Sequence, residues 1–127
     1  MARAGYFFPH DEFYGASMRD VMAEIARRAR PGAQVASESP ILAAYYAERA
    51  NRKDLIFVSL SDPAARKQLR EGDFLIDERG RRYFSNDALL SSLRRSITPA
   101  FSTSLGGIHS ADLYQLDTAA LQILQKQ

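Results

Sequence analysis

The segment YFFPHDEFY, residues 6–14, places His10, Asp11 and Glu12 side by side, and these three residue types could bind a metal or transfer protons. A metal site requires ligands that converge on one ion, whereas three consecutive side chains diverge. The chain contains no cysteine, so disulfides, thiol nucleophiles and cysteine-based zinc sites are excluded. We therefore expect no metal ion at this segment and no bound cofactor.

The rest of the sequence carries no catalytic or nucleotide-binding motif. The whole chain has two histidines, His10 and His109, and no GxSxG nucleophile elbow accompanies them. The first predicted strand is followed by SESP, which has no glycine, and its Glu38 would repel a phosphate. The 17 Lys and Arg residues are interspersed with 15 Asp and Glu residues, so no strong field for nucleic acid is expected. The chain by itself is not expected to be an enzyme.

Four polar residues form the candidate ligand site, namely Glu38, Ser59, Asp62 and Asp77, which end or follow the three predicted parallel strands. Ligands of open α/β sheets bind outside the carboxyl ends of such strands, so this polar rim could hold a sugar or a cation. Ser and Asp at these positions also suit helix caps and turns, where they satisfy free backbone N–H groups. We favour the capping and turn roles.

The elements that would position these residues alternate between helix and strand. Ser17 is the predicted N-cap of the first helix, with Asp20 at the third helical position, and apolar residues recur at helical spacing after it. Residues 55–60, in contrast, include an unbroken apolar run, typical of a strand covered on both faces. This alternation predicts an α/β three-layer sandwich with a small, mostly parallel mixed sheet, a Rossmann-like half that ends in an antiparallel hairpin. The expected parallel strands are residues 33–37, 55–60 and 73–77; the hairpin strands are residues 99–104 and 111–116, joined through Gly106 and Gly107; the helices are residues 18–30, 40–49, 63–69, 86–95 and 118–127.

Residues 1–14 are predicted to be an aromatic linker, and residues 15–127 a single α/β domain. No apolar run reaches the roughly 18–20 residues that cross a bilayer. Amphipathic aromatic rings favour a membrane–water interface. In the isolated chain the same rings could mediate self-association, so a homodimer is one expectation. The aromatic residues concerned are Tyr6, Phe7, Phe8, Phe13 and Tyr14.

Several stretches of the chain carry a family resemblance. They are the lead YFFPHDEFY, the helix exit RPGA, the strand QVAS, the helix PILAAYYAER, which bears two adjacent tyrosines, and the later stretch GDFLIDERGRRYFSNDALLSSLR. Together they resemble the region after the last membrane helix of certain bacterial polytopic glycosyltransferases, and the last stretch is similar to a strand, turn and helix near the end of such proteins. The family is the dolichyl-phosphate-mannose-protein mannosyltransferase type, with its aminoarabinose-transferase relatives, and the resemblance covers most of the chain.

The resemblance implies a soluble, extracytoplasmic (periplasmic) domain that accompanies a transferase using a polyprenyl-phosphate-linked sugar. Its partners would be the membrane-embedded part of the parent enzyme and the nearby membrane surface, and it would aid acceptor or partner binding. The aromatic lead would then lie where a membrane helix gives way to water. The acidic catalytic residues of the family lie in its first external loop, which this chain lacks, so no catalytic residue carries over.

Two other functions stay open at this stage. The chain could be a free-standing module that binds a small ligand at the polar rim. It could also be a structural or interaction domain, dimeric through its aromatic lead or an edge strand, because unpaired strand edges readily take up another strand.

Overall fold

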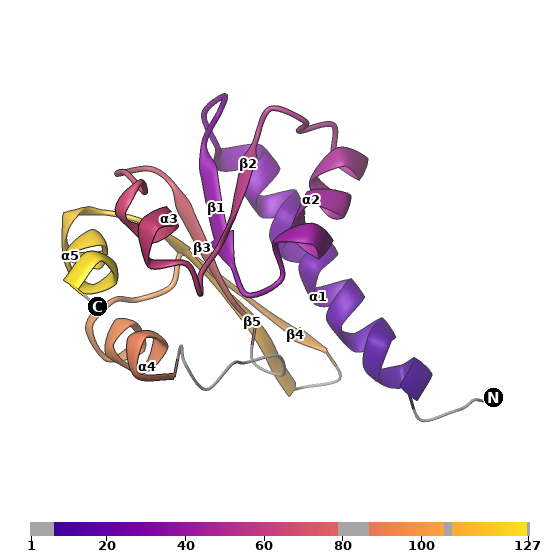
Figure 1. Cartoon of the computed structure of the whole chain (residues 1–127). Helices are drawn as coiled ribbons and strands as arrows, with labels where there is room; N and C mark the ends of the chain where they lie inside the picture. The colour runs from indigo at the N-terminus through magenta and orange to yellow at the C-terminus, as the bar shows by residue number, and fades with distance from the viewer. Residues whose placement is uncertain (1–6, 79–86, 106–107, 127) are drawn as a thin grey trace.

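The computed structural model describes residues 7–78, 87–105 and 108–126. Helices and strands alternate along the first half of the chain, and a strand hairpin follows near its end (Figure 1). The elements are α1 (Phe7–Arg28), β1 (Gln34–Ser37), α2 (Pro40–Arg49), β2 (Ile56–Ser59), α3 (Pro63–Lys67), β3 (Phe74–Glu78), α4 (Asp87–Ser96), β4 (Phe101–Leu105), β5 (Ile108–Gln115) and α5 (Thr118–Lys126).

The five strands form one mixed sheet in the order β2-β1-β3-β5-β4. β1 pairs in parallel with both β2 and β3, whereas β5 pairs antiparallel with β3 and β4. The predicted α/β class, with a mostly parallel core and an antiparallel end, is confirmed. Among the described strands β2 and β4 are the two edges, and each has one strand partner.

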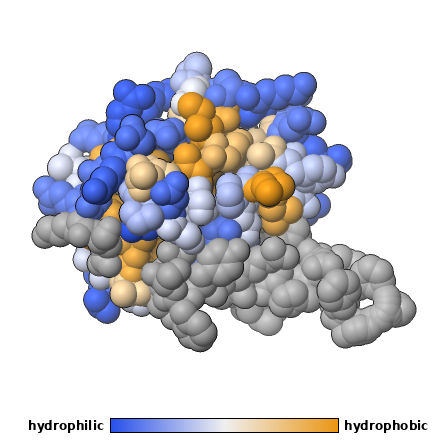
Figure 2. Space-filling model, viewed as in Figure 1, coloured by the Kyte–Doolittle hydropathy of each residue, from blue (hydrophilic) through white to orange (hydrophobic). Residues whose placement is uncertain are grey.

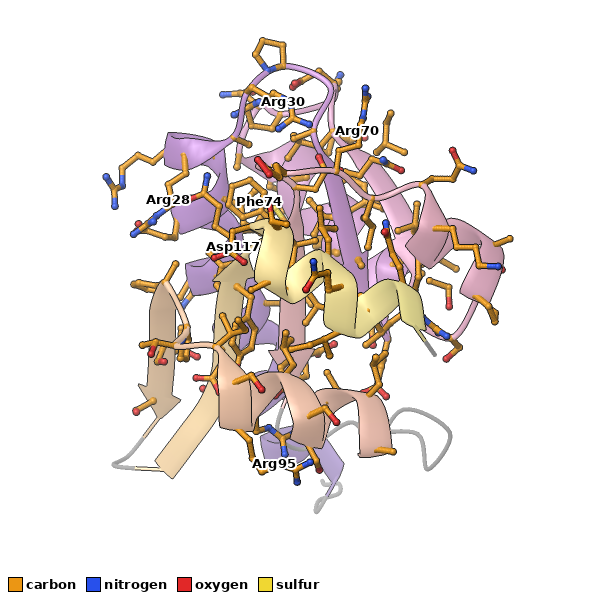
Figure 3. The ribbon with its side chains drawn as sticks, turned by 90° about the vertical axis from the view of Figure 1, so that its left-hand side faces the viewer. Arg28, Arg30, Arg70, Phe74, Arg95 and Asp117 are labelled. Carbon is orange, nitrogen blue, oxygen red and sulfur yellow. The ribbon has the colours of Figure 1, made fainter. Side chains whose placement is uncertain are left out.

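Helices cover both faces of the sheet, which gives three layers. Figure 1 shows α1 and α2 on one side of the strands, and Figure 3 shows α4 and α5 across the other. β3 supplies both cores because successive side chains point to opposite faces. Phe74 and Ile76 join the core under α1 and α2, and Leu75 joins the core that contains Leu90 and Leu124. This two-sided burial explains the continuous apolar run of the strand.

α1 begins ten residues before the predicted N-cap at Ser17, so that boundary was wrong. The helix includes residues 7–14 of the predicted linker. Pro9 is its third residue, where an intrahelical N–H partner is missing in any case, so the helix tolerates proline there. Gly15 costs only about 1 kcal/mol in a helix interior. Figure 1 shows the N-terminal part of α1 extending past the sheet.

The starts of α2 and α3 are as predicted. Pro40 is the first residue of α2 after Ser39, and the Asp62 carboxylate accepts a hydrogen bond from the Ala64 backbone N–H at 3.0 Å. Ser39 itself makes no side-chain cap; its own N–H donates instead to the Ser37 hydroxyl at 3.1 Å. The Asp62 cap therefore fixes the turn from β2 into α3.

The hairpin covers residues 101–115 in place of the predicted 99–116, and its second strand starts earlier than predicted. β5 begins at Ile108 and not at residue 111, so His109, expected in the turn, lies in a strand opposite Ser104. Strand pairing continues up to the two residues that separate the strands, because each added ladder pair satisfies backbone groups. The predicted turn residues Gly106 and Gly107 lie outside the described residues, as does Tyr6.

Two buried carboxylates tie the helices and loops to β3. Asp73, with a fully buried side chain, accepts hydrogen bonds from the Arg30 guanidinium, the Gln34 backbone and side chain and the Arg70 backbone, at 2.8 to 3.3 Å. Asp77, also fully buried, accepts two hydrogen bonds from Arg94 of α4, at 2.7 and 3.2 Å. Both contacts link elements that are far apart in sequence.

Candidate functional site

The topology brings three of the four predicted rim residues together at the carboxyl ends of the parallel strands. Ser37 pairs with Ser59, and Ala36 pairs with Leu75, so Glu38, Ser59 and Asp77 all lie at the carboxyl ends of the parallel strands. Open α/β sheets bind ligands just outside these carboxyl ends. The placement therefore matches the geometry assumed for the polar rim.

The rim residues also contact the protein's own groups. The Ser59 hydroxyl accepts a hydrogen bond from the Ser61 backbone N–H at 3.2 Å, Asp62 caps α3, and Asp77 binds Arg94. Glu38 is buried, with 5% of its surface exposed. In the described ranges no group of three or more His, Cys, Asp and Glu side chains is placed to hold a metal ion. Ligand binding at this rim stays a prediction.

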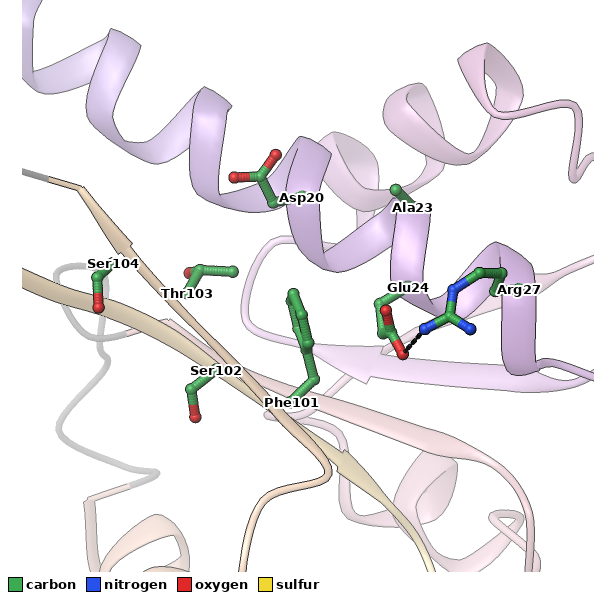
Figure 4. Close-up of a pocket in the computed structure, with 8 residues that line it drawn as sticks. All are labelled: Asp20, Ala23, Glu24, Arg27, Phe101, Ser102, Thr103 and Ser104. Carbon is green, nitrogen blue, oxygen red and sulfur yellow. Dashed lines mark hydrogen bonds and ion pairs between the residues drawn. The ribbon is translucent and has the colours of Figure 1, made fainter.

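A groove between α1 and the edge strand β4 is the more open feature, and sequence reasoning missed it (Figure 4). It has a volume of about 480 Å³. One wall is a single face of α1, formed by Asp20, Ala23, Glu24 and Arg27 at the i, i+3, i+4 and i+7 spacing. The other wall is the edge of the sheet, formed by the four consecutive residues 101–104.

The side chains of β4 alternate between the face of the sheet that α1 covers and the opposite face. Figure 4 shows Phe101 and Thr103 directed toward α1, with Ser102 and Ser104 on the other side of the strand. The Thr103 hydroxyl shares a 2.7 Å hydrogen bond with the Ser110 hydroxyl, and the Ser102 hydroxyl donates to Asp112 at 2.6 Å. These hydrogen bonds to β5 hold β4 in place, so the wall of the groove that β4 forms is well fixed.

A charged cluster closes the groove at the C-terminal end of α1. The Glu24 carboxylate accepts hydrogen bonds from Arg27 and from Arg28, the latter at 2.5 Å, and Arg28 also donates to the Ala100 carbonyl at 3.4 Å. The hydrogen bonds from Arg27 and then from Arg28 lower the pKa of Glu24 below its ordinary value near 4.5. Two cations share one carboxylate, so this end keeps a net positive charge.

Glu24→Gln should remove one component of the acid sensitivity of the fold. A carboxyl group with a lowered pKa stabilises the protein above its unfolded-state pKa, and this contribution is lost as the pH falls through the folded-state pKa. The difference in unfolding free energy between wild type and variant should thus be constant above about pH 6 and shrink below about pH 4. Urea denaturation at several pH values measures it; a difference that grows on acidification would contradict the assignment.

Apolar side chains are exposed on β2, the edge strand at the other side of the sheet from β4, and on α2. Ile41 of α2 is 87% exposed, Ile56 of β2 is 51% exposed, and Tyr45 is 54% exposed with the Arg49 guanidinium 5.6 Å from its ring centre. The view of Figure 2 shows hydrophobic surface over α2 and β2 within a mostly hydrophilic face. Sequence spacing alone placed these residues on elements without deciding which ones would face solvent.

The predicted aromatic lead is helical from its second aromatic residue onward. Phe7, Phe8, Phe13 and Tyr14 belong by backbone to the first half of α1, and Tyr6 lies outside the described residues. Their assignment to a membrane interface or to self-association stays a prediction. No helix in the described part of the chain is long and apolar enough to cross a membrane.

No family model matches the chain, and no match is found among curated proteins or solved structures.

Proposed function

We propose that this chain is a non-catalytic accessory domain of a membrane glycosyltransferase that uses a polyprenyl-phosphate-linked sugar, on the extracytoplasmic side of the membrane. The observation that carries the proposal is α1. Its 22 residues span about 33 Å, and they run without a break from the aromatic segment into the core of the domain. A continuous helix holds what it connects at a fixed distance and angle, as an accessory domain beside an active site requires.

The core contacts of α1 support this role. Met18, Val21, Met22 and Ile25 are all buried against the sheet, so the C-terminal part of the helix is fixed to the domain. The preceding residues 7–17 belong to the same helix and include residues 7–14 of the segment that resembles the family's lead. In the parent enzyme that extension would join the membrane-embedded part, and the domain would aid the binding of an acceptor or a partner.

The native product tests the proposal directly. An antibody raised against this chain should detect, in membranes of the cells that express it, a polypeptide far larger than 14.2 kDa that resists carbonate extraction. Deleting the codons for this domain should reduce glycosyl transfer in those membranes. A native product of about 14 kDa recovered without membranes would overturn the assignment.

The small-ligand module is the second candidate, favoured by the convergence of Glu38, Ser59 and Asp77 at one sheet edge. The structural contacts of Ser59, Asp62 and Asp77 already account for these side chains. We therefore rank it below the accessory domain.

A further inference from the structure

We propose that the groove between α1 and β4 binds an extended peptide segment of another protein, which adds to β4 as a further strand. The inference goes beyond the accessory role and does not depend on it, because a free-standing protein with this groove would bind the same segment.

The backbone of β4 supplies the first argument. β4 lies at the edge of the described sheet and pairs only with β5 there, so the N–H and C=O groups on its other side are available to a new strand. Residues 101–104 line the groove consecutively, which means that the cavity follows this open edge. A register shift between Thr103 and Ser104 interrupts regular pairing, so the added strand would pair along residues 101–103. Peptides bind other domains in this way, with main-chain bonds giving affinity and side-chain pockets giving specificity.

The shape of the helix wall supplies the second argument. Ala23 is exposed at the centre of the wall, and its methyl group leaves room for a larger side chain from a partner. Phe101, half-buried against the core, lies across from it and offers an apolar contact (Figure 4). An apolar residue at the middle of the bound segment would fit between them.

The charges at the two ends define the segment further. Asp20 lies at the end of the groove formed by Thr103 and Ser104, and its exposed carboxylate forms an ion pair with Arg19 at 3.8 Å, a contact longer than a hydrogen bond. Arg27, at the Phe101 end, keeps 72% of its side chain exposed and contributes to the net positive charge around Glu24. A partner with a basic residue toward Asp20 and an acidic residue toward Arg27 would therefore complement the groove.

The spacing of these charges sets the sequence pattern. Positions 20 and 27 of α1 are about 10 Å apart along the helix axis. Residues i and i+4 of a strand face the same way and are about 13 Å apart, a separation that long side chains can adjust. A strand antiparallel to β4 would run from the Ser104 end to the Phe101 end, so the pattern reads basic, any, apolar, any, acidic.

A second copy of this chain fits the groove less well. The two edge strands, β2 (IFVS) and β4 (FSTSL), contain no charged residue, so neither would meet Asp20 or Arg27. The observations favour a peptide from a different protein.

Fluorescence anisotropy with the full chain tests the proposal. The probe is a labelled nine-residue peptide of threonine with lysine, valine and glutamate at its third, fifth and seventh positions, and the comparison peptide exchanges the two charges. We expect the first peptide to bind more tightly. Ala23→Trp, which fills the helix wall, should weaken binding at least tenfold, whereas Ala119→Trp, at an exposed position of α5, should leave it unchanged.

Charge-reversed variants and amide hydrogen exchange then identify the binding mode. Asp20→Lys should weaken binding about threefold, the size expected for an exposed ion pair, and glutamate at the third peptide position should restore it. Bound peptide should slow amide hydrogen exchange at residues 101–103. The proposal is overturned if no charge arrangement of the peptide binds below about 1 mM, if Ala23→Trp binds like wild type, or if exchange in β4 is unaffected. Sedimentation that shows a dimer abolished by Ala23→Trp would assign the groove to a second copy and overturn it too.

Discussion

Asp73→Ala should lower the free energy of unfolding by about 3–4 kcal/mol, the largest effect we expect from one substitution. The side chain is completely buried and accepts four hydrogen bonds, one from the Arg30 guanidinium, two from Gln34 and one from the Arg70 backbone. Hydrogen bonds to a charged group contribute about 1.5–3 kcal/mol each, and a buried donor left without a partner costs about 1–3 kcal/mol. Urea denaturation followed by circular dichroism measures the loss.

The matched control for Asp73 is Asp20→Ala, because Asp20 is exposed on α1 and should change stability by less than about 0.5 kcal/mol. Asp73→Asn keeps one acceptor oxygen and should fall between the two. The position of Asp73 directly before β3 explains the size of the effect. Its carboxylate joins the loop after α1, the start of β1 and the loop before β3. Equal stabilities of Asp73→Ala and Asp20→Ala would show that these bonds contribute nothing.

Arg94→Ala should destabilise the protein by about 3 kcal/mol, because it leaves the Asp77 carboxylate buried without its two Arg94 bonds. Its control is Arg95→Ala, since Arg95 is the exposed neighbour of Arg94 on α4 (Figure 3). Hydrogen bonding to Asp77 raises the pKa of Arg94 further above its ordinary value. The contribution of the pair is therefore fully present below that ordinary value and should not change between about pH 6 and pH 9.

The double variant Asp77→Asn, Arg94→Met separates the pair interaction from the cost of a buried charge. Removing both charges and retaining most of the volume should recover at least half of the loss seen with Arg94→Ala, since a buried pair often differs little in free energy from an apolar replacement. A double-mutant cycle in urea gives the coupling energy. If the double variant is less stable than Arg94→Ala, the pair itself and not the isolated charge determines the stability.

The sequence by itself determined the layer architecture. Local rules were sufficient for it: helical spacing in α1, Pro40 and Asp62 at helix starts, and the continuous apolar run of β2 each report on a few neighbouring residues. The alternation predicts helices on both faces of the sheet, and β3, buried along its whole length, has that cover. The run of β2 lies instead on an edge strand, where Ile56 is 51% exposed, so the run alone did not report its burial.

The tertiary structure decided the start of α1, the extent of β5 and the candidate groove. The capping signal at Ser17 and the helical spacing after it predicted a later start, whereas the folded helix continues back through Gly15 and Pro9, which it tolerates. The groove depends on the approach of residues 20–27 to residues 101–104, about eighty positions apart, and no local pattern encodes that distance. Alternating serine and threonine in FSTSL could have indicated an edge strand. Only the packing of α1 beside that edge shows that a space for a partner lies there.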